Sequence, residues 1–166
     1  MPLIGSHATV AGGLATGGLG YAAEVGAEVI RVFVSSPRGW AAVQRHPKAG
    51  LCLDTCHLFA AGHDLTAPGG VAAMLDKLGT AAGPATETAA GTSGRARPPV
   101  RLVHANDSLL GCGSKRDRHE AIGAGQIGTG PFRELLAALP DVPFVVETPG
   151  GKAGHARDIA TLRGLR

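Results

Sequence analysis

The chain has few of the residues that anchor a large core. Only 4% of its 166 residues are aromatic and 17% are charged, whereas 26 are glycine. No apolar run approaches the roughly 18 residues of a membrane span. The amino-terminal segment also lacks the cationic start and the long apolar run of a signal peptide. These absences argue against a membrane partner and predict a globular protein of the cytoplasm.

Cysteine is also scarce. The three cysteines, Cys52, Cys56 and Cys112, include no Cys-x-x-Cys pair. An odd number without such a pair argues against a disulfide framework and against a cysteine-based zinc finger. Cys52 and Cys56 alternate with Leu51, Leu53 and Thr55. We expect the two thiols to be buried packing residues while these three residues point outward. The formal net charge of +3 permits a polyanionic partner without requiring one.

Apolar segments typical of strands alternate with segments that have helical periodicity. Alternation of this kind predicts a parallel sheet with helices outside it, an α/β fold. Gly79 follows one predicted helix as its expected C-cap. The predicted strands are residues 3–7, 28–34, 50–54, 100–106 and 142–147. The predicted helices are residues 14–26, 40–45, 71–78, 131–139 and 155–162.

One segment lacks any apolar pattern. In residues 80–99, 17 of 20 residues are Ala, Gly, Thr, Pro or Ser, a composition that cannot bury a face and predicts a low-complexity linker. We interpret residues 1–166 as a single domain that contains this linker. The length falls below the roughly 200 to 250 residues of a closed (β/α)8 barrel.

Polar residues stand where predicted strands end. Asp54, His104 and Glu147 each follow an apolar run, and the carboxyl ends of parallel strands are the rim where α/β folds collect their active sites. Carboxylates and imidazoles are the ligands with which Zn²⁺ or Mn²⁺ sites bind phosphate esters. Further donors of the same types lie in the segments that follow: His57, Asp117 and His119.

Each feature has a plainer interpretation when taken alone. A single histidine at a strand end is more often a hydrogen-bonded rim residue than a metal ligand. An aspartate such as Asp54 is often a helix N-cap. The run Gly123-Ala-Gly-Gln-Ile-Gly128 matches a dinucleotide-binding pattern, but it follows a polar loop. We therefore expect it to form the turn before the next helix.

The joint spacing of several segments goes beyond these single features. Asp54-Thr-Cys-His57 with the following Phe-Ala-Ala-Gly-His-Asp64, and His104-Ala-Asn-Asp with Asp117-Arg-His119, closely resemble two signature segments of the endonuclease IV family of apurinic/apyrimidinic endonucleases. Three shorter segments are similar to other strands of that family in the right order: Ile4-Gly-Ser-His7, Ser36-Pro-Arg-Gly-Trp40 and Glu147-Thr-Pro149.

The resemblance implies a (β/α)8 barrel, three zinc ions per chain and hydrolysis of the DNA backbone 5′ to an abasic site. It assigns His57, Asp117 and His119 to one zinc. It assigns Asp54, His104 and Glu147 to a second, with Asp54 and Glu147 as the catalytic carboxylates. Double-stranded DNA with abasic sites is the implied partner. The implied DNA-contacting residue is Arg38, and the basic residues Lys115, Arg116 and Arg118 are further candidates for contact with DNA.

The chain departs from the family between Trp40 and Gly50, where three strand-helix units are missing. With them go two histidine ligands of one of the family's three zinc ions and the glutamate that bridges this ion to a second. We therefore expect an incomplete barrel of about five parallel strands, one or two zinc ions or manganese in their place, and open strand edges through which copies could associate. Two other interpretations stay open. One is a non-catalytic zinc-binding remnant of the family, and the other is a related barrel with sugar isomerase chemistry.

Overall fold

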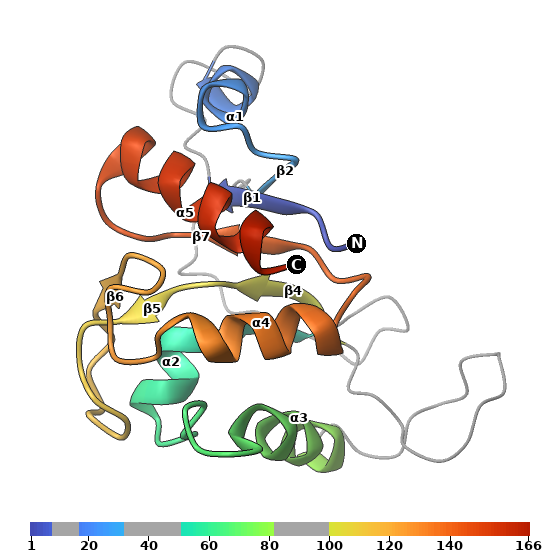
Figure 1. Cartoon of the computed structure of the whole chain (residues 1–166), viewed down its shortest axis with the longest axis vertical. Coiled ribbons are helices and arrows are strands. Elements are labelled where there is room, and N and C mark those ends of the chain that lie inside the picture. The colour runs from blue at the N-terminus through green and yellow to red at the C-terminus, as the bar shows by residue number, and fades with distance from the viewer. Residues whose placement is uncertain (8–16, 32–50, 82–99) are drawn as a thin grey trace, which may run out of the picture.

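The structure is a computed structural model, and it describes residues 1–7, 17–31, 51–81 and 100–166. A five-stranded parallel sheet with the order β2-β1-β7-β4-β3 runs through the middle of the molecule (Figure 1). β2 and β3 are the outer strands among the described residues, as expected for a barrel that lacks its middle units. The strands are β1 (Ile4–His7), β2 (Val29–Arg31), β3 (Leu51–Asp54), β4 (Val100–His104) and β7 (Phe144–Val146).

One face of this sheet forms the hydrophobic core. Ile4, Phe144 and Val103 occupy neighbouring strands in register and are fully buried, and Leu53 pairs with Val103 on the same face. Because side chains alternate across a strand, the next residue of each strand points to the opposite face. His104 and Asp54 therefore lie together on that opposite face, at the carboxyl end of the sheet.

Helices cover the core face. In Figure 1, α5 lies across β1 and β7, and it contacts β1, β7, α1 and α4, while α4 also contacts α3. The predicted apolar stripe of α4 is confirmed, because Phe132, Leu135 and Leu136 are buried in the core. The helices are α1 (Leu19–Val25), α2 (Thr55–Ala60), α3 (Gly70–Ala81), α4 (Thr129–Ala138) and α5 (Gly151–Leu165). Among the described helices, none is both long and apolar enough to cross a membrane.

The structure corrects several predicted boundaries. α3 continues through Gly79 to Ala81, so Gly79 is not a C-cap and the first two residues of the predicted linker are helical. α5 begins four residues before the predicted start, at Gly151. The helix α2 was not predicted as a separate element. The predicted helix at 40–45 and residues 82–99 of the linker lie outside the described residues.

The predicted burial of cysteine is half right. Cys56 is buried, but Cys52 is exposed on the outer strand β3. The alternation of that strand places Leu53 in the core, 4% exposed, and Cys52 on the opposite face. Thr55 is likewise buried, because its hydroxyl group bonds to backbone atoms at the end of β4. The expectation that Leu53 and Thr55 point outward is therefore wrong.

A small antiparallel ribbon follows β4 and was not predicted. It pairs β5 (Asp107–Ser108) with β6 (His119–Glu120). The glycine-rich run at 123–128 returns beside this ribbon and directs backbone N–H groups at the buried carboxylate of Asp107. The run does form the turn before α4, as predicted. Its N–H groups bind the side chain of Asp107, in place of the phosphate group that such a run binds in a dinucleotide site.

Candidate metal centre

Three strands deliver a carboxylate, an imidazole and a second carboxylate to one point. His104 is the last residue of β4, Asp54 ends β3, and Glu147 follows β7 directly. The Nδ1 atom of His104 lies 3.2 Å from Oε2 of Glu147 and 3.6 Å from Oδ2 of Asp54. The three ligand atoms lie close enough together to hold one metal ion. The second set predicted from the sequence therefore comes together through adjacent strand ends.

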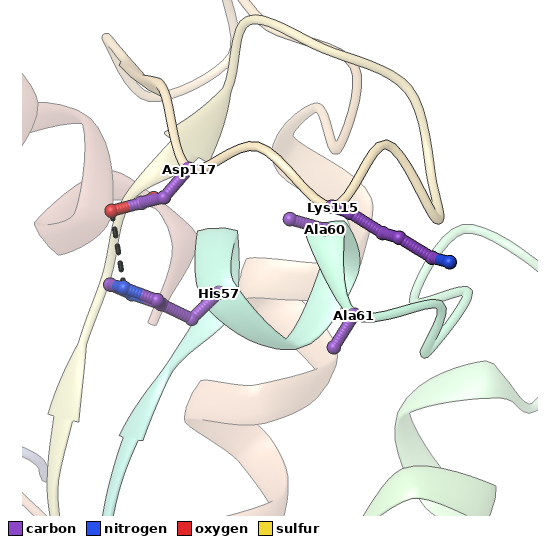
Figure 2. Close-up of a pocket in the computed structure, with 5 residues that line it drawn as sticks. All are labelled: His57, Ala60, Ala61, Lys115 and Asp117. Carbon is purple, nitrogen blue, oxygen red and sulfur yellow. Dashed lines mark ion pairs between the residues drawn. The ribbon is translucent and has the colours of Figure 1, made fainter.

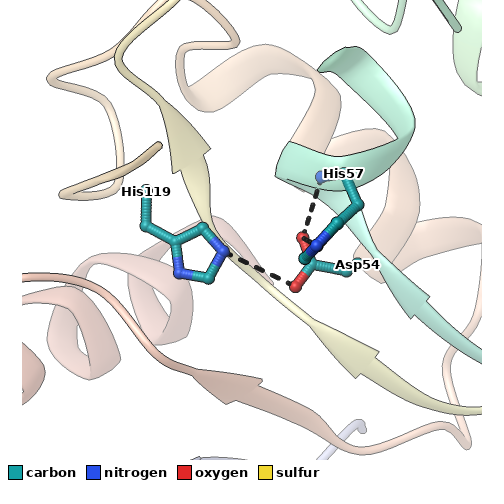
Figure 3. Close-up of side chains that lie close together, drawn as sticks. All are labelled: Asp54, His57 and His119. Atoms are coloured by element: carbon teal, nitrogen blue, oxygen red, sulfur yellow. Dashed lines mark hydrogen bonds and ion pairs between the residues drawn. The ribbon is translucent and has the colours of Figure 1, made fainter. Parts of the chain in front are cut away.

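The other predicted set is placed by α2 and the loop before β6. Asp54 caps α2, because its Oδ1 accepts the backbone N–H of His57 at 3.0 Å. This cap puts the His57 ring beside the carboxylate, with Nδ1 3.2 Å from Oδ1. In Figure 3, His119 approaches the same carboxylate from the other side, with Nε2 3.8 Å from Oδ2. The plainer interpretation of Asp54 as an N-cap is thus correct alongside its position in the cluster.

Asp117 connects the two histidines of this set. Its Oδ2 lies 3.1 Å from Nε2 of His57, and its Oδ1 lies 3.2 Å from Nε2 of His119. Figure 2 shows the first of these ion pairs beside an open cavity of about 320 Å³. All six side chains predicted as metal ligands therefore lie in one continuous cluster, with Asp54 between its two halves.

Several atoms of the cluster suit a metal ion. Nε2 of His104, Nε2 of His119 and Oδ1 of Asp117 are buried without a hydrogen-bond partner. Buried polar atoms are normally hydrogen-bonded, so these three atoms call for an explanation, although Nε2 of His119 and Oδ1 of Asp117 lie 3.2 Å apart as an ion pair. Two groupings of ligand atoms share Asp54: one includes His57 and His119, and the other includes His104 and Glu147. Carboxylate and imidazole donors of this kind fit Zn²⁺ or Mn²⁺.

A third grouping joins Cys56 to Asp117 and His119. Burial raises the pKa of the Cys56 thiol to about 11, so without a metal the thiol remains protonated at neutral pH. A protonated thiol is a poor metal ligand, because the thiolate is the coordinating species. The imidazole and carboxylate groupings are therefore the better sites.

The charges of Asp54 and His104 stabilise each other. Burial alone would raise the pKa of Asp54, but hydrogen bonds from His104 and from the backbone N–H of His57 outweigh it and lower that pKa to about 2. Burial alone would lower the pKa of His104, but its hydrogen bonds to Asp54, Cys52 and Glu147 raise that pKa to about 11. The metal-free cluster therefore holds an imidazolium at neutral pH.

This protonation state predicts that metal binding releases a proton. A metal bound by His104 requires the neutral imidazole, so the His104 proton must leave at any pH below about 11. Apparent metal affinity should therefore rise with pH across the neutral range. We expect calorimetric titrations of Zn²⁺ at pH 7, in buffers of different ionisation enthalpy, to show about one proton released for the ion bound at this grouping. Zinc uptake without proton release would contradict the prediction.

Asn106 is a residue of the centre that the sequence analysis did not single out. Its side chain is fully buried; Nδ2 donates to Oδ2 of Asp54 at 3.0 Å, and Oδ1 accepts the backbone N–H of Glu147 at 2.9 Å. The backbone of Asn106 also exchanges hydrogen bonds with the hydroxyl group of Thr55. Asn106 thus fixes the ends of β3, β4 and β7 relative to one another. The polar residues of the segment His-Ala-Asn-Asp, directly after the apolar run of β4, were the available signal.

Two further residues reach Glu147 from the outer part of the sheet. Nη1 of Arg31 donates to Oε1 of Glu147 at 2.7 Å, and Nδ1 of His7 lies 3.4 Å from the same oxygen. Burial lowers the pKa of His7, although Glu147 opposes the shift. A charged residue within the apolar segment at 28–34 was the signal for Arg31.

The predicted DNA-contacting residues border this centre where the structure describes them. Lys115, Arg116 and Arg118 are exposed in the loop before β6. Lys115 has the positive φ of 56° and lines the cavity, and its side chain extends away from His57 and Asp117 in Figure 2. Arg38 lies outside the described residues.

Parallel strands, outer helices and a carboxylate and imidazole cluster at the carboxyl ends define an α/β protein of TIM-barrel type with a candidate metal centre. The family model described as a xylose isomerase-like TIM barrel matches residues 24–165. The chain belongs to this family, and within it to the endonuclease IV proteins. The expected fold class is thereby confirmed as a barrel-type sheet of five strands.

Individual relatives show how much of the barrel is present. "Probable endonuclease 4" of Streptomyces coelicolor is 53% identical over 127 residues, which are 75% of this chain and 39% of that protein. "Probable endonuclease 4" of Methanosphaera stadtmanae is 31% identical over 142 residues, which are 84% of this chain and 46% of that protein. The crystal structure of endonuclease IV from Thermus thermophilus matches with a TM-score of 0.53 and 33% identity, covering 70% of this chain and 38% of that one. The chain thus spans less than half the length of these relatives.

Proposed function

We propose that this protein is a zinc-dependent phosphodiesterase that hydrolyses the DNA backbone 5′ to abasic sites. The observation that carries the proposal is the convergence of the six predicted ligands on one rim of the sheet. These side chains come from three strand ends, from α2, from the loop before β6 and from β6 itself, and three of them leave a buried polar atom without a hydrogen bond. Membership of the endonuclease IV family supplies the class of reaction.

The side chains of the chain itself have distinct tasks in this proposal. Asp54 lies between the two ligand groupings, so its carboxylate would be shared by ions bound in both. Glu147 would bind through Oε2, which faces His104, while Oε1 stays paired with Arg31. Zinc or manganese bound here would neutralise the phosphate and lower the pKa of a water molecule. Asn106 would hold the carboxylate of Asp54 and the backbone of Glu147 in place without titrating.

DNA would be held by charge outside the cluster. Lys115, Arg116 and Arg118 present cations beside the metal centre, and Arg38 would add another from the segment after β2. Contacts of this kind go to backbone phosphates and position the duplex without reading sequence. The cavity next to His57 offers room for a sugar and phosphate beside the metals. An abasic nucleotide leaves the stack at low cost, because it has no base to unpair.

Incision of a duplex with a single abasic site tests the proposal. We expect the zinc-loaded protein to cut 5′ to the lesion and Glu147→Gln to lose at least about 100-fold of that rate, since the substitution removes a ligand charge where the reaction needs it. The glutamine keeps an oxygen for Arg31 and nearly the same volume. Equal cutting by both proteins would assign the activity to a contaminant and would contradict the proposal.

A second candidate function is zinc binding without catalysis. The observation that favours it is that the chain spans only 39% of its Streptomyces coelicolor relative. In that case His57, Asp117 and His119 would hold an ion, and no incision would be seen from folded, metal-loaded protein. Metal analysis after gel filtration, run beside the incision assay, separates this outcome from a protein that takes up no metal.

A further inference from the structure

Arg31 occupies an unusual position for a cation. It lies on the outer strand β2, in register with His7 of β1, on the same face of the sheet as the metal centre. Its Nη1 atom donates to Oε1 of Glu147 at 2.7 Å. The side chain is 28% exposed and that of Glu147 is 22% exposed, so the pair lies at the accessible rim of the sheet.

The carboxylates of the centre leave it with excess negative charge, and the ion pair of Arg31 with Glu147 offsets part of that charge. Asp54, Asp117 and Glu147 contribute three negative charges, and histidines that bind a metal are neutral. Of the ion pairs that the described residues form with these carboxylates, only that of Arg31 involves a permanent cation. A phosphate that approaches the centre carries further negative charge and must be compensated. At Glu147, the positive charge that offsets the phosphate would come from a bound metal ion and from Arg31.

The chemistry of guanidinium suits this task. Its planar set of N–H donors matches the oxygens of a phosphate, and it stays charged at every pH at which the protein is folded. A lysine ammonium would provide charge without that geometry. Held through Nη1 by Glu147, the guanidinium is fixed in orientation before the substrate arrives, so little entropy is lost when it binds.

We propose that Arg31 is a phosphate-binding residue of this centre, anchored by Glu147 and directed at the phosphodiester group held by the metal. This inference rests on the proposed function and adds a specific contact to it. A purely structural ion pair would affect folding and the placement of Glu147. A phosphate contact affects the affinity for the anion while the metal remains bound, and this difference can be measured.

The test compares Arg31→Gln with Arg133→Gln in zinc-loaded protein freed of excess metal, with inorganic phosphate as the probe. Arg133 is exposed on α4 and is absent from the ion pairs of the centre. Calorimetric titration should show phosphate affinity about tenfold or more weaker for Arg31→Gln, the loss expected for one charge-assisted hydrogen bond, and unchanged for Arg133→Gln. The zinc content of the two variants should be the same.

Equal phosphate affinity in the two variants, or no phosphate binding by the wild type, would overturn the inference. Loss of zinc together with phosphate from Arg31→Gln would also overturn it, and would make Arg31 a positioning residue of Glu147. If the wild type takes up no zinc, the proposed function fails. The inference then fails with it, because the phosphate that Arg31 is proposed to contact is held by the metal.

A second measurement needs no variant and so does not depend on folding. Phenylglyoxal modifies accessible arginines, and peptide mass spectrometry reports the extent of modification at each one. Phosphate should slow the modification of Arg31 in the wild-type protein and leave that of Arg133 unchanged. Modification of Arg31 at the same rate with and without phosphate would contradict a phosphate contact.

Discussion

Replacing Asp107 by alanine is expected to lower the free energy of unfolding by about 3–5 kcal/mol, enough to unfold a marginal domain. The carboxylate is fully buried and accepts five backbone N–H bonds. Alanine would leave these donors without their acceptor, and the loss is costly for the buried N–H groups of Ser108 and Ile127 above all. Urea unfolding followed by circular dichroism measures the change. Asp107→Ala with wild-type stability would show that the run at 123–128 holds its conformation without the anion.

The run at 123–128 and the helix α4 that follows it offer a matched pair of glycine variants. A Cβ atom on Gly125 would collide with the backbone oxygen of Ser108 and lie 2.5 Å from Oδ1 of Asp107, so Gly125→Ala should also destabilise the protein strongly. Gly130 lies in α4 with open space where its Cβ would be. Gly130→Ala should therefore be neutral or stabilise by about 0.5–1 kcal/mol. Equal effects of the two substitutions on the free energy of unfolding would contradict the close packing of the run at 123–128 around Asp107.

The other large effect is expected at Asp54. Asp54→Asn should weaken zinc binding by more than about 100-fold in both ligand groupings, because the carboxylate belongs to each of them and the loss of even an outer partner costs up to that factor. The asparagine can still cap α2 through its side-chain oxygen, so the fold should remain. Competition with a fluorescent zinc chelator gives the affinities. One ion bound with wild-type affinity would show that the two groupings do not share Asp54.

Asp64 provides the control for this experiment. Its exposed carboxylate accepts hydrogen bonds from Thr66 and from the backbone of Ala67, and it is absent from the candidate ligand groupings among the described residues. Asp64→Asn removes the same charge from the chain and should leave zinc affinity unchanged. A loss comparable to that of Asp54→Asn would point to overall charge as the cause.

Half of the centre was predictable because three of its candidate ligands follow a rule of parallel sheets. Asp54, His104 and Glu147 were singled out as the residues that end apolar runs, and parallel strands bring such ends together at one rim. Asn106 and Arg31 were missed for different physical reasons. The role of Asn106 depends on two hydrogen bonds to other strands. That of Arg31 depends on β2 lying next to β1, which in turn pairs with β7.

Boundaries and faces were less predictable. Propensity places a stop at Gly79, but α3 passes through it with its apolar side packed against the core, since tertiary packing outweighs the roughly 1 kcal/mol cost of a helical glycine. Whether Cys52 is buried or exposed depends on which face of the edge strand β3 is covered by other elements. That is a property of the neighbouring elements, and the residue pattern of β3 alone does not contain it.

Sequence by itself determined the class of fold, the family and the six candidate ligands. Apolar periodicity and short motifs can be read from neighbouring residues in the sequence, without knowledge of the contacts between distant segments. Only the tertiary structure decided which of these side chains lie close enough together to share an ion, that the glycine-rich run encloses Asp107, and that Arg31 pairs with Glu147. These are contacts between residues up to 116 positions apart. Their formation depends on strand order and register, which arise when the whole sheet assembles.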